Sequence, residues 1–129
     1  AGVEAVLARS AARHASPQAA ERLQAAAAAM TAAVAQNDVL AFLEADKLLD
    51  EVVADAADNA FAVRVAAPLQ THSRRFWFRY QSNTGLAQSA EHHLRLIKAI
   101  LDRDEWQAGR EAERLMTMLR QLAESAARL

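Results

Sequence analysis

Residues that interrupt an α-helix are scarce in this chain. Only 3 glycines and 2 prolines occur among 129 residues, whereas alanine and leucine, two of the strongest helix formers, dominate the composition. Aromatic residues make up 5% of the chain, and no segment shows the alternation of β-branched and polar residues that marks a half-buried strand. The sequence therefore predicts an all-α protein.

A few short segments can end one helix and start the next, and they divide the chain into about six helices. Serine, asparagine and aspartate accept hydrogen bonds from the free N–H groups of a helix start, and proline is tolerated at its first position. The predicted breaks are Ser16-Pro17, Asn37-Asp38, Asp58-Asn59, the loop at 82–85, and Asp104. The predicted helices cover residues 1–14, 17–36, 39–55, 60–81, with a bend near Pro68, 86–102 and 104–129. Short connections are typical of an antiparallel bundle, so we expect residues 1–129 to form one helical domain.

Composition excludes several functional classes. The 15 basic and 16 acidic residues are interspersed and give a net charge of -1, so the chain has no basic field for binding nucleic-acid phosphates. Cysteine is absent, which excludes disulfides and thiolate ligands. No apolar run has the length of a membrane span, and no signal peptide is visible, so we expect a cytoplasmic protein with no membrane partner. Phosphate-binding loops and nucleophile elbows are missing, and we expect no enzymatic activity.

Ionisable residues fall on the apolar stripes of three predicted helices. At about 100° per residue, Asp46 lies in the centre of the stripe of helix 39–55 with Asp50 one turn later, His72 lies on the stripe of helix 60–81, and His93 on that of helix 86–102. Burying an unpaired carboxylate is costly, so these groups predict a polar cavity inside the bundle. For each histidine the alternative is a hydrogen-bonded core residue, and Asp50 could instead reach solvent at the edge of its stripe.

Three arginines and four aromatic residues are mixed between positions 74 and 80. Such a mixture could form a nucleic-acid surface with stacking rings, but an ordinary helix with inward aromatics and outward arginines is the interpretation we favour. Arg75 lies within about one turn of His72 on the same flank, so it could reach an anionic ligand as a bidentate clamp.

Several segments resemble one known family in their order and spacing. They are Asp46 to Asp50, the Asp58-Asn59 break, Ser73 to Phe78, and Glu91 to Ile100 followed by Asp104 and Ala108. Together they resemble the FCD domain of GntR-type bacterial transcription regulators over nearly the whole chain. The resemblance implies a homodimeric regulator in which this domain binds a small effector, commonly an organic acid. It also implies a preceding winged helix-turn-helix domain that binds operator DNA, which we expect to lie outside these 129 residues.

The resemblance further implies a divalent metal in many members, held by an Asp-x-x-x-His pair, a histidine of the Glu-His segment and a histidine of the last helix. Asp46 matches the first ligand and His93 the third, whereas Asp50 replaces the second and Leu115 the fourth. Three candidate ligands remain for zinc, nickel or manganese, so we expect such a metal to be weakly held or absent. Without metal, the polar residues of the cavity would contact the effector directly. The ligand-binding set is then Asp46, Asp50, His72, Arg75 and His93.

Two other functional classes compete with effector binding. In a ligand-free structural or dimerisation module, the inward polar residues would satisfy one another, and the missing histidine at position 115 favours this alternative mildly. A ferritin-like metal enzyme would need Glu-x-x-His sets on its helices, and no such set occurs in the sequence. The sequence therefore favours an effector-binding regulatory domain.

Overall fold

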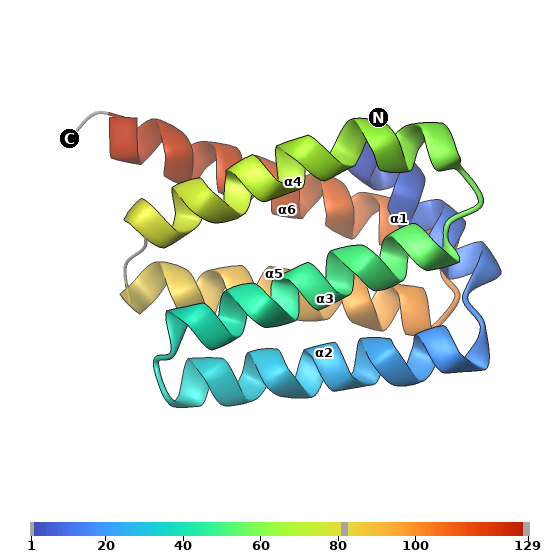
Figure 1. Ribbon diagram of the computed structural model, residues 1–129, viewed down its shortest axis with the longest axis horizontal. Coiled ribbons are helices and arrows are strands. Elements are labelled where there is room, and N and C mark those ends of the chain that lie inside the picture. Colours follow the sequence, from blue (N-terminus) through green and yellow to red (C-terminus); the bar gives the residue numbers. More distant parts are fainter. Residues whose placement is uncertain (1, 81–82, 128–129) are drawn as a thin grey trace.

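The computed structural model describes residues 2–80 and 83–127, and six α-helices contain nearly all of them. The helices are α1 (Val3–His14), α2 (Pro17–Ala35), α3 (Val39–Ala56), α4 (Ala60–Tyr80), α5 (Asn83–Leu101) and α6 (Glu105–Ala127). No strand occurs within the described ranges, so the prediction of an all-α bundle of about six helices is confirmed. From α3 to α6, each helix runs roughly antiparallel to the one before it (Figure 1).

Capping side chains begin four of the helices at the predicted breaks. In each case the side-chain oxygen accepts a hydrogen bond from the backbone N–H three residues later, which satisfies a donor that the helix leaves free. The pairs are Ser16 Oγ with Ala19 (3.1 Å), Asp38 Oδ1 with Ala41 (3.0 Å), Asn59 Oδ1 with Ala62 (2.9 Å) and Asp104 Oδ1 with Gln107 (3.0 Å). The remaining break, the loop at 82–85, differs from the prediction, because α5 already begins at Asn83 and residues 83–85 are helical. Ser82 lies outside the described residues.

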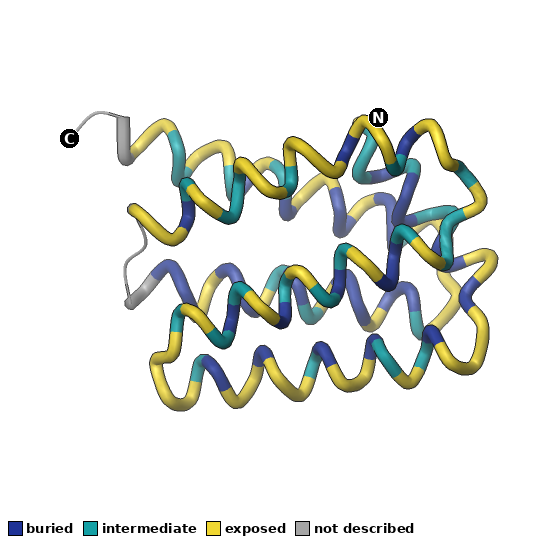
Figure 2. The backbone as a smooth tube through the Cα atoms, in the orientation of Figure 1, coloured by how far each residue is buried: buried dark blue, intermediate teal, exposed yellow. Residues whose placement is uncertain are grey.

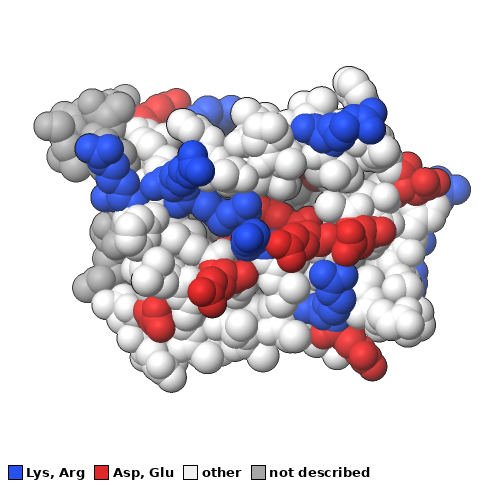
Figure 3. Space-filling model, in the orientation of Figure 1, with Lys and Arg blue, Asp and Glu red and all other residues white. Residues whose placement is uncertain are grey.

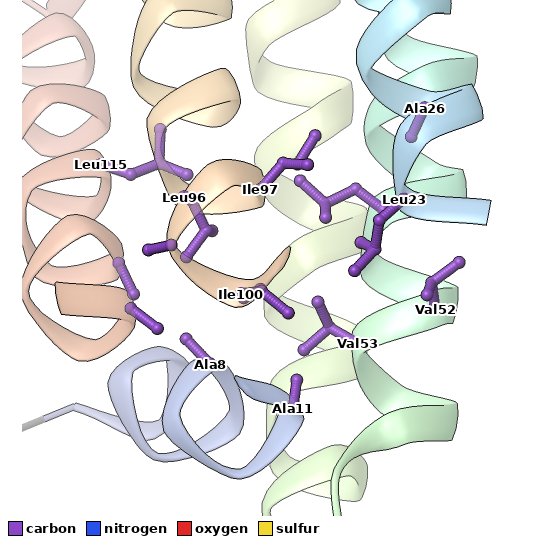
Figure 4. Packing of buried hydrophobic residues seen from close by; sticks show 14 of the residues in the cluster. Ala8, Ala11, Leu23, Ala26, Val52, Val53, Leu96, Ile97, Ile100 and Leu115 are labelled. Carbon is purple, nitrogen blue, oxygen red and sulfur yellow. The ribbon is translucent and has the colours of Figure 1, made fainter. Parts of the chain in front are cut away.

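Small residues allow α1 to pack closely at one end of the bundle. This helix contacts α3, α4, α5 and α6, and Ala8, Ala11 and Ala12 on it are buried. Figure 4 shows Ala8 and Ala11 pointing into the interior near Ile100 and Val53. Because alanine has a short side chain, the backbones can approach closely without leaving a void. The first helix is thus an integral part of the core and brings its own side chains to the interior.

Burial follows one face of each helix, as expected for a two-sided helix in a bundle. Figure 2 shows buried and exposed positions alternating along the helices, with the buried positions turned toward the neighbouring helices. Within the described residues, no helix is long and apolar enough to span a bilayer.

The inward face of α4 differs from the face that the sequence predicted. The predicted inward stripe through His72 also contains the large apolar residues Phe61, Val65 and Leu69 on the same side of the helix, but all three are exposed, Phe61 by 71%. The buried residues of α4 include Ala62 and Ala66, one residue further along the chain than Phe61 and Val65, and also Trp77 near the end of the helix. The helix is therefore rotated by about one residue, 100°, relative to the prediction, and its small residues pack against α1 and α3. The prediction was wrong because it relied on the large apolar side chains, and the size of a side chain does not show which face of a helix contacts a neighbouring helix.

Candidate functional site

A cavity of about 390 Å³ lies inside the bundle and opens toward solvent. Its buried and half-buried polar side chains come from α1, α3, α4 and α5, whereas α6 contributes leucine, methionine and alanine and, at exposed positions, Glu113 and Arg120. In Figure 3, acidic and basic side chains meet at the middle of the face on which α3 and α4 lie. The cavity thus has a charged wall on one side and an apolar wall on the other.

Two aspartates of α3 form the centre of the charged wall. Asp46 and Asp50 lie one helical turn apart, both line the cavity, and their side chains are only 16% and 22% exposed. Burial raises the pKa of Asp50 well above its usual value, and the nearby charges of Asp46 and Glu4 raise it further against the attraction of Arg74. The prediction that Asp46 and Asp50 point inward is therefore confirmed for both residues.

His93 of α5 is buried and forms hydrogen bonds through both ring nitrogens. Nδ1 lies 2.7 Å from the carbonyl oxygen of Ser89, and Nε2 lies 3.0 Å from Asp46 Oδ1. The Ser89 carbonyl oxygen can only accept, so Nδ1 donates to it, and Nε2 donates as well when Asp46 is a carboxylate; the ring is then an imidazolium paired with that carboxylate. Burial lowers the pKa of His93, but the charge and hydrogen bond of Asp46, with the Ser89 carbonyl and Asp50, outweigh it and raise the pKa overall. The ring also meets the edge of Phe42 at 5.4 Å between centroids.

Arg74 of α4 connects the two aspartates. Its Nη1 lies 2.5 Å from Asp50 Oδ2 and 3.9 Å from Asp46 Oδ2, and its side chain is 17% exposed. The sequence-based prediction named the neighbouring Arg75 instead, because it placed the wrong face of α4 toward the interior. Periodicity anchored on Ala62 and Ala66 places residue 73 on the inward face, since eleven and seven residues are near whole numbers of turns. Arg74 lies next to that position and, like Ser73, lines the cavity.

Glu4 and Gln70 complete the charged wall, and sequence reasoning identified neither. Gln70 Nε2 donates to the Glu4 carboxylate, at 3.1 Å from Oε1 and 3.3 Å from Oε2, and both residues line the cavity. Burial raises the pKa of Glu4, with a further contribution from the charge of Asp46, although the hydrogen bond from Gln70 lowers it. A glutamate in the first turn of a helix looks in sequence like an ordinary helix start.

His72 and Arg75 lie outside this cluster. Both are exposed and neither lines the cavity, so the prediction that His72 points into the polar interior is wrong. Arg75, which was expected to reach a ligand from the same flank, lies outside the cavity as well. The cause is the rotation of α4 described above, which turns residues 61, 65, 69 and 72 toward solvent. Of the five predicted ligand-binding residues, the structure brings together Asp46, Asp50 and His93.

The candidate metal ligands do not fit a divalent ion in their present arrangement. No group of three histidine or carboxylate side chains that could hold a metal occurs in the described part of the chain. His93 directs Nε2 at Asp46, and Arg74 Nη1 lies against Asp50. Leu115, at the place of the fourth family ligand, is buried and lines the cavity, where it offers no donor atom.

Ser89, His93 and Asp46 superficially resemble a nucleophilic triad, but the hydrogen bonds do not suit that chemistry. Nδ1 of His93 donates to the Ser89 carbonyl oxygen at 2.7 Å, whereas the hydroxyl oxygen lies 3.4 Å away. A general base needs an unprotonated nitrogen facing the hydroxyl, and here that nitrogen carries the proton. The arrangement is suited to binding a polar group rather than to activating the serine.

The sequence model of the FCD domain matches residues 1–125. Among curated proteins, no relative matches the chain.

Proposed function

The chain belongs to the FCD domain family, the regulatory domains of GntR-type transcription regulators, and on this premise we propose that it binds a small organic effector in the cavity. Binding would shift the balance between two arrangements of the bundle. A separate winged-helix domain, in a homodimer, would then bind its operator DNA more or less tightly. The domain itself performs no catalysis in this proposal.

The observation that carries the proposal is the two-sided cavity. Its volume of about 390 Å³ lies within the range of roughly 300–1,000 Å³ that is usual for small-molecule sites. The charged wall is built by residues from four helices, whereas Leu115, Met116 and Leu119 of α6 form part of the apolar wall. An effector with a polar head and a short apolar body would be complementary to both walls.

Arg74 supports a carboxylate as the polar head. Its ion pairs with the aspartates use Nη1, which leaves Nε and Nη2 of the same planar group for an incoming carboxylate. The cost of bringing a further negative charge beside Asp46 and Asp50 falls if one of these acids takes up a proton. The raised pKa of Asp50 makes such a proton uptake favourable.

A thermal-shift screen tests the proposal. Small mono- and dicarboxylates of increasing apolar length are added to the purified chain. A ligand that binds only the folded state stabilises it by about 2.7 kcal/mol at one hundred times its Kd and thereby raises Tm. Leu115→Phe adds volume to the apolar wall and is expected to reduce the shift. Leu40→Phe is the matched control, because Leu40 is exposed and does not line the cavity.

Two results would contradict effector binding in this cavity. The first is a panel in which no compound changes Tm. The second is a shift that Leu115→Phe leaves unaltered, because the compound would then bind elsewhere. A dimer that forms without any ligand response would instead support the structural module.

A further inference from the structure

We infer that Arg74 takes the place of the divalent cation that the family resemblance implies, so that this cavity works without metal; the role of Arg74 toward an effector rests on the function proposed above. The guanidinium lies where two inward carboxylates need a positive charge. It pairs with Asp50 at 2.5 Å and approaches Asp46 at 3.9 Å through the same nitrogen.

Geometry makes Arg74 and a metal mutually exclusive. A zinc ion binds carboxylate oxygens at about 2.0–2.2 Å, and Asp50 Oδ2 already has Nη1 at hydrogen-bond distance. For a metal to bind both Asp46 and Asp50, the guanidinium would have to leave the space between α3 and α4. Even after that displacement, the positive charge of Arg74 would remain near the incoming cation, and the repulsion between the two charges opposes metal binding.

Both ring nitrogens of His93 also form hydrogen bonds within the chain, so neither is free to bind a metal. A histidine ligates a metal through a nitrogen whose lone pair faces the ion, but Nε2 of His93 lies 3.0 Å from Asp46 Oδ1 and the other nitrogen is bonded to the Ser89 carbonyl. Metal binding would therefore break the pair between His93 and Asp46 as well as the pairs of Arg74. Three interactions within the chain would be lost for each metal bound.

The two departures from the family's ligand pattern agree with this substitution. Asp50 stands at the position of a neutral histidine ligand and adds a negative charge, which Arg74 pairs with directly. Leu115 replaces the last ligand with an apolar side chain in the cavity lining. An arginine is always charged and presents several N–H groups in one plane, so it can bind Asp50 and a carboxylate effector at the same time, as a metal would.

The test measures metal binding, with and without Arg74. The chain is treated with a chelator, dialysed and titrated with Zn²⁺, Ni²⁺ and Mn²⁺ by calorimetry, while circular dichroism checks the fold. We expect the natural chain to show no stoichiometric site. Arg74→Ala uncovers Asp46 and Asp50 and is expected to gain at least tenfold in affinity for one equivalent of metal, and Asp46→Ala in the same background should cancel that gain.

Arg75→Ala is the matched control, because it removes the adjacent arginine of the same helix, which is exposed and lies outside the cavity lining. It should bind metal no better than the natural chain. If the natural chain binds one equivalent of metal with a Kd below about 1 μM, an affinity of roughly 8 kcal/mol, the inference is wrong. It is equally wrong if Arg74→Ala is folded and gains no site.

Failure of this inference can be separated from failure of the proposed function. Metal titration needs no effector, so a metal site in the natural chain would refute the role of Arg74 and leave effector binding intact. Conversely, a chain that binds neither metal nor any carboxylate would refute the proposed function alone. Should Arg74→Ala be unfolded, Arg74→Gln keeps a polar side chain of smaller volume and answers the same question.

Discussion

Replacement of Asp46 by alanine tests the buried pair at the centre of the cavity. The change removes the acceptor of the His93 Nε2 proton at 3.0 Å and leaves a buried imidazolium without that partner. Breaking a buried ion pair costs roughly 3–5 kcal/mol, but Asp46 is 16% exposed and its loss relieves repulsion with Asp50 and Glu4. We therefore expect the free energy of unfolding to fall by about 2 kcal/mol near pH 6, or a Tm lower by roughly 5–10 °C.

The cost of Asp46→Ala should depend on pH in a defined direction. Asp46 raises the pKa of His93 in the folded state, so the stability it contributes is fully present below the unfolded pKa of about 6.5. That contribution is lost as the pH rises through the raised folded pKa. The difference between the natural chain and Asp46→Ala should hence be largest near pH 6 and smaller at pH 9.

Urea denaturation followed by circular dichroism at pH 6 and pH 9 measures this difference. Asp55→Ala is the matched control, because Asp55 belongs to the same helix but pairs with Arg22 in an exposed ion pair, which is worth little. A destabilisation of equal size at both pH values would refute the imidazolium–carboxylate assignment. So would a destabilisation no larger than that of the control.

Two further predictions concern the rotation of α4 and the charge of the cavity. Ile100→Ala removes a fully buried side chain and should lower the free energy of unfolding by about 2–5 kcal/mol. Phe61→Ala, on the exposed face of α4, should change it by less than about 0.5 kcal/mol. A large loss of stability for Phe61→Ala in urea denaturation would mean that the orientation predicted from the sequence was right. Because burial raises the pKa of Glu4, its charge opposes folding once the pH exceeds the unfolded pKa, so Glu4→Gln should raise Tm at pH 8 and leave it unchanged at pH 4, and a lower Tm at pH 8 would contradict this.

Local chemistry accounts for the parts of the fold that were predicted correctly. A capping side chain such as Asp38 or Asn59 bonds to a backbone N–H three residues away, so its effect is contained within one short segment of sequence. The scarcity of glycine and proline acts in the same local way. Helix number and most helix ends were therefore predictable, and the start of α5 was missed because Asn83, Thr84 and Gly85 suit a first turn as well as a loop.

The orientation of α4 was decided by its neighbours. Two stripes compete on this helix, a large apolar one through Phe61, Val65 and Leu69 and a small one through Ala62 and Ala66. Only the small one allows the close approach to α1 and α3 that the structure shows. Periodicity identifies both stripes but carries no information about which of them meets another helix.

The same distinction divides the candidate site. The sequence by itself determined that Asp46, Asp50 and His93 point inward, because each lies on a stripe whose other members are apolar and must be buried. Only the tertiary structure decided that Arg74 and Glu4 join them, since these side chains come from α4 and α1, and the contacts join residues 24 and 66 positions apart. The charge of the cavity, and with it the kind of ligand it can bind, is a property of helices brought together and cannot be assigned to any one of them.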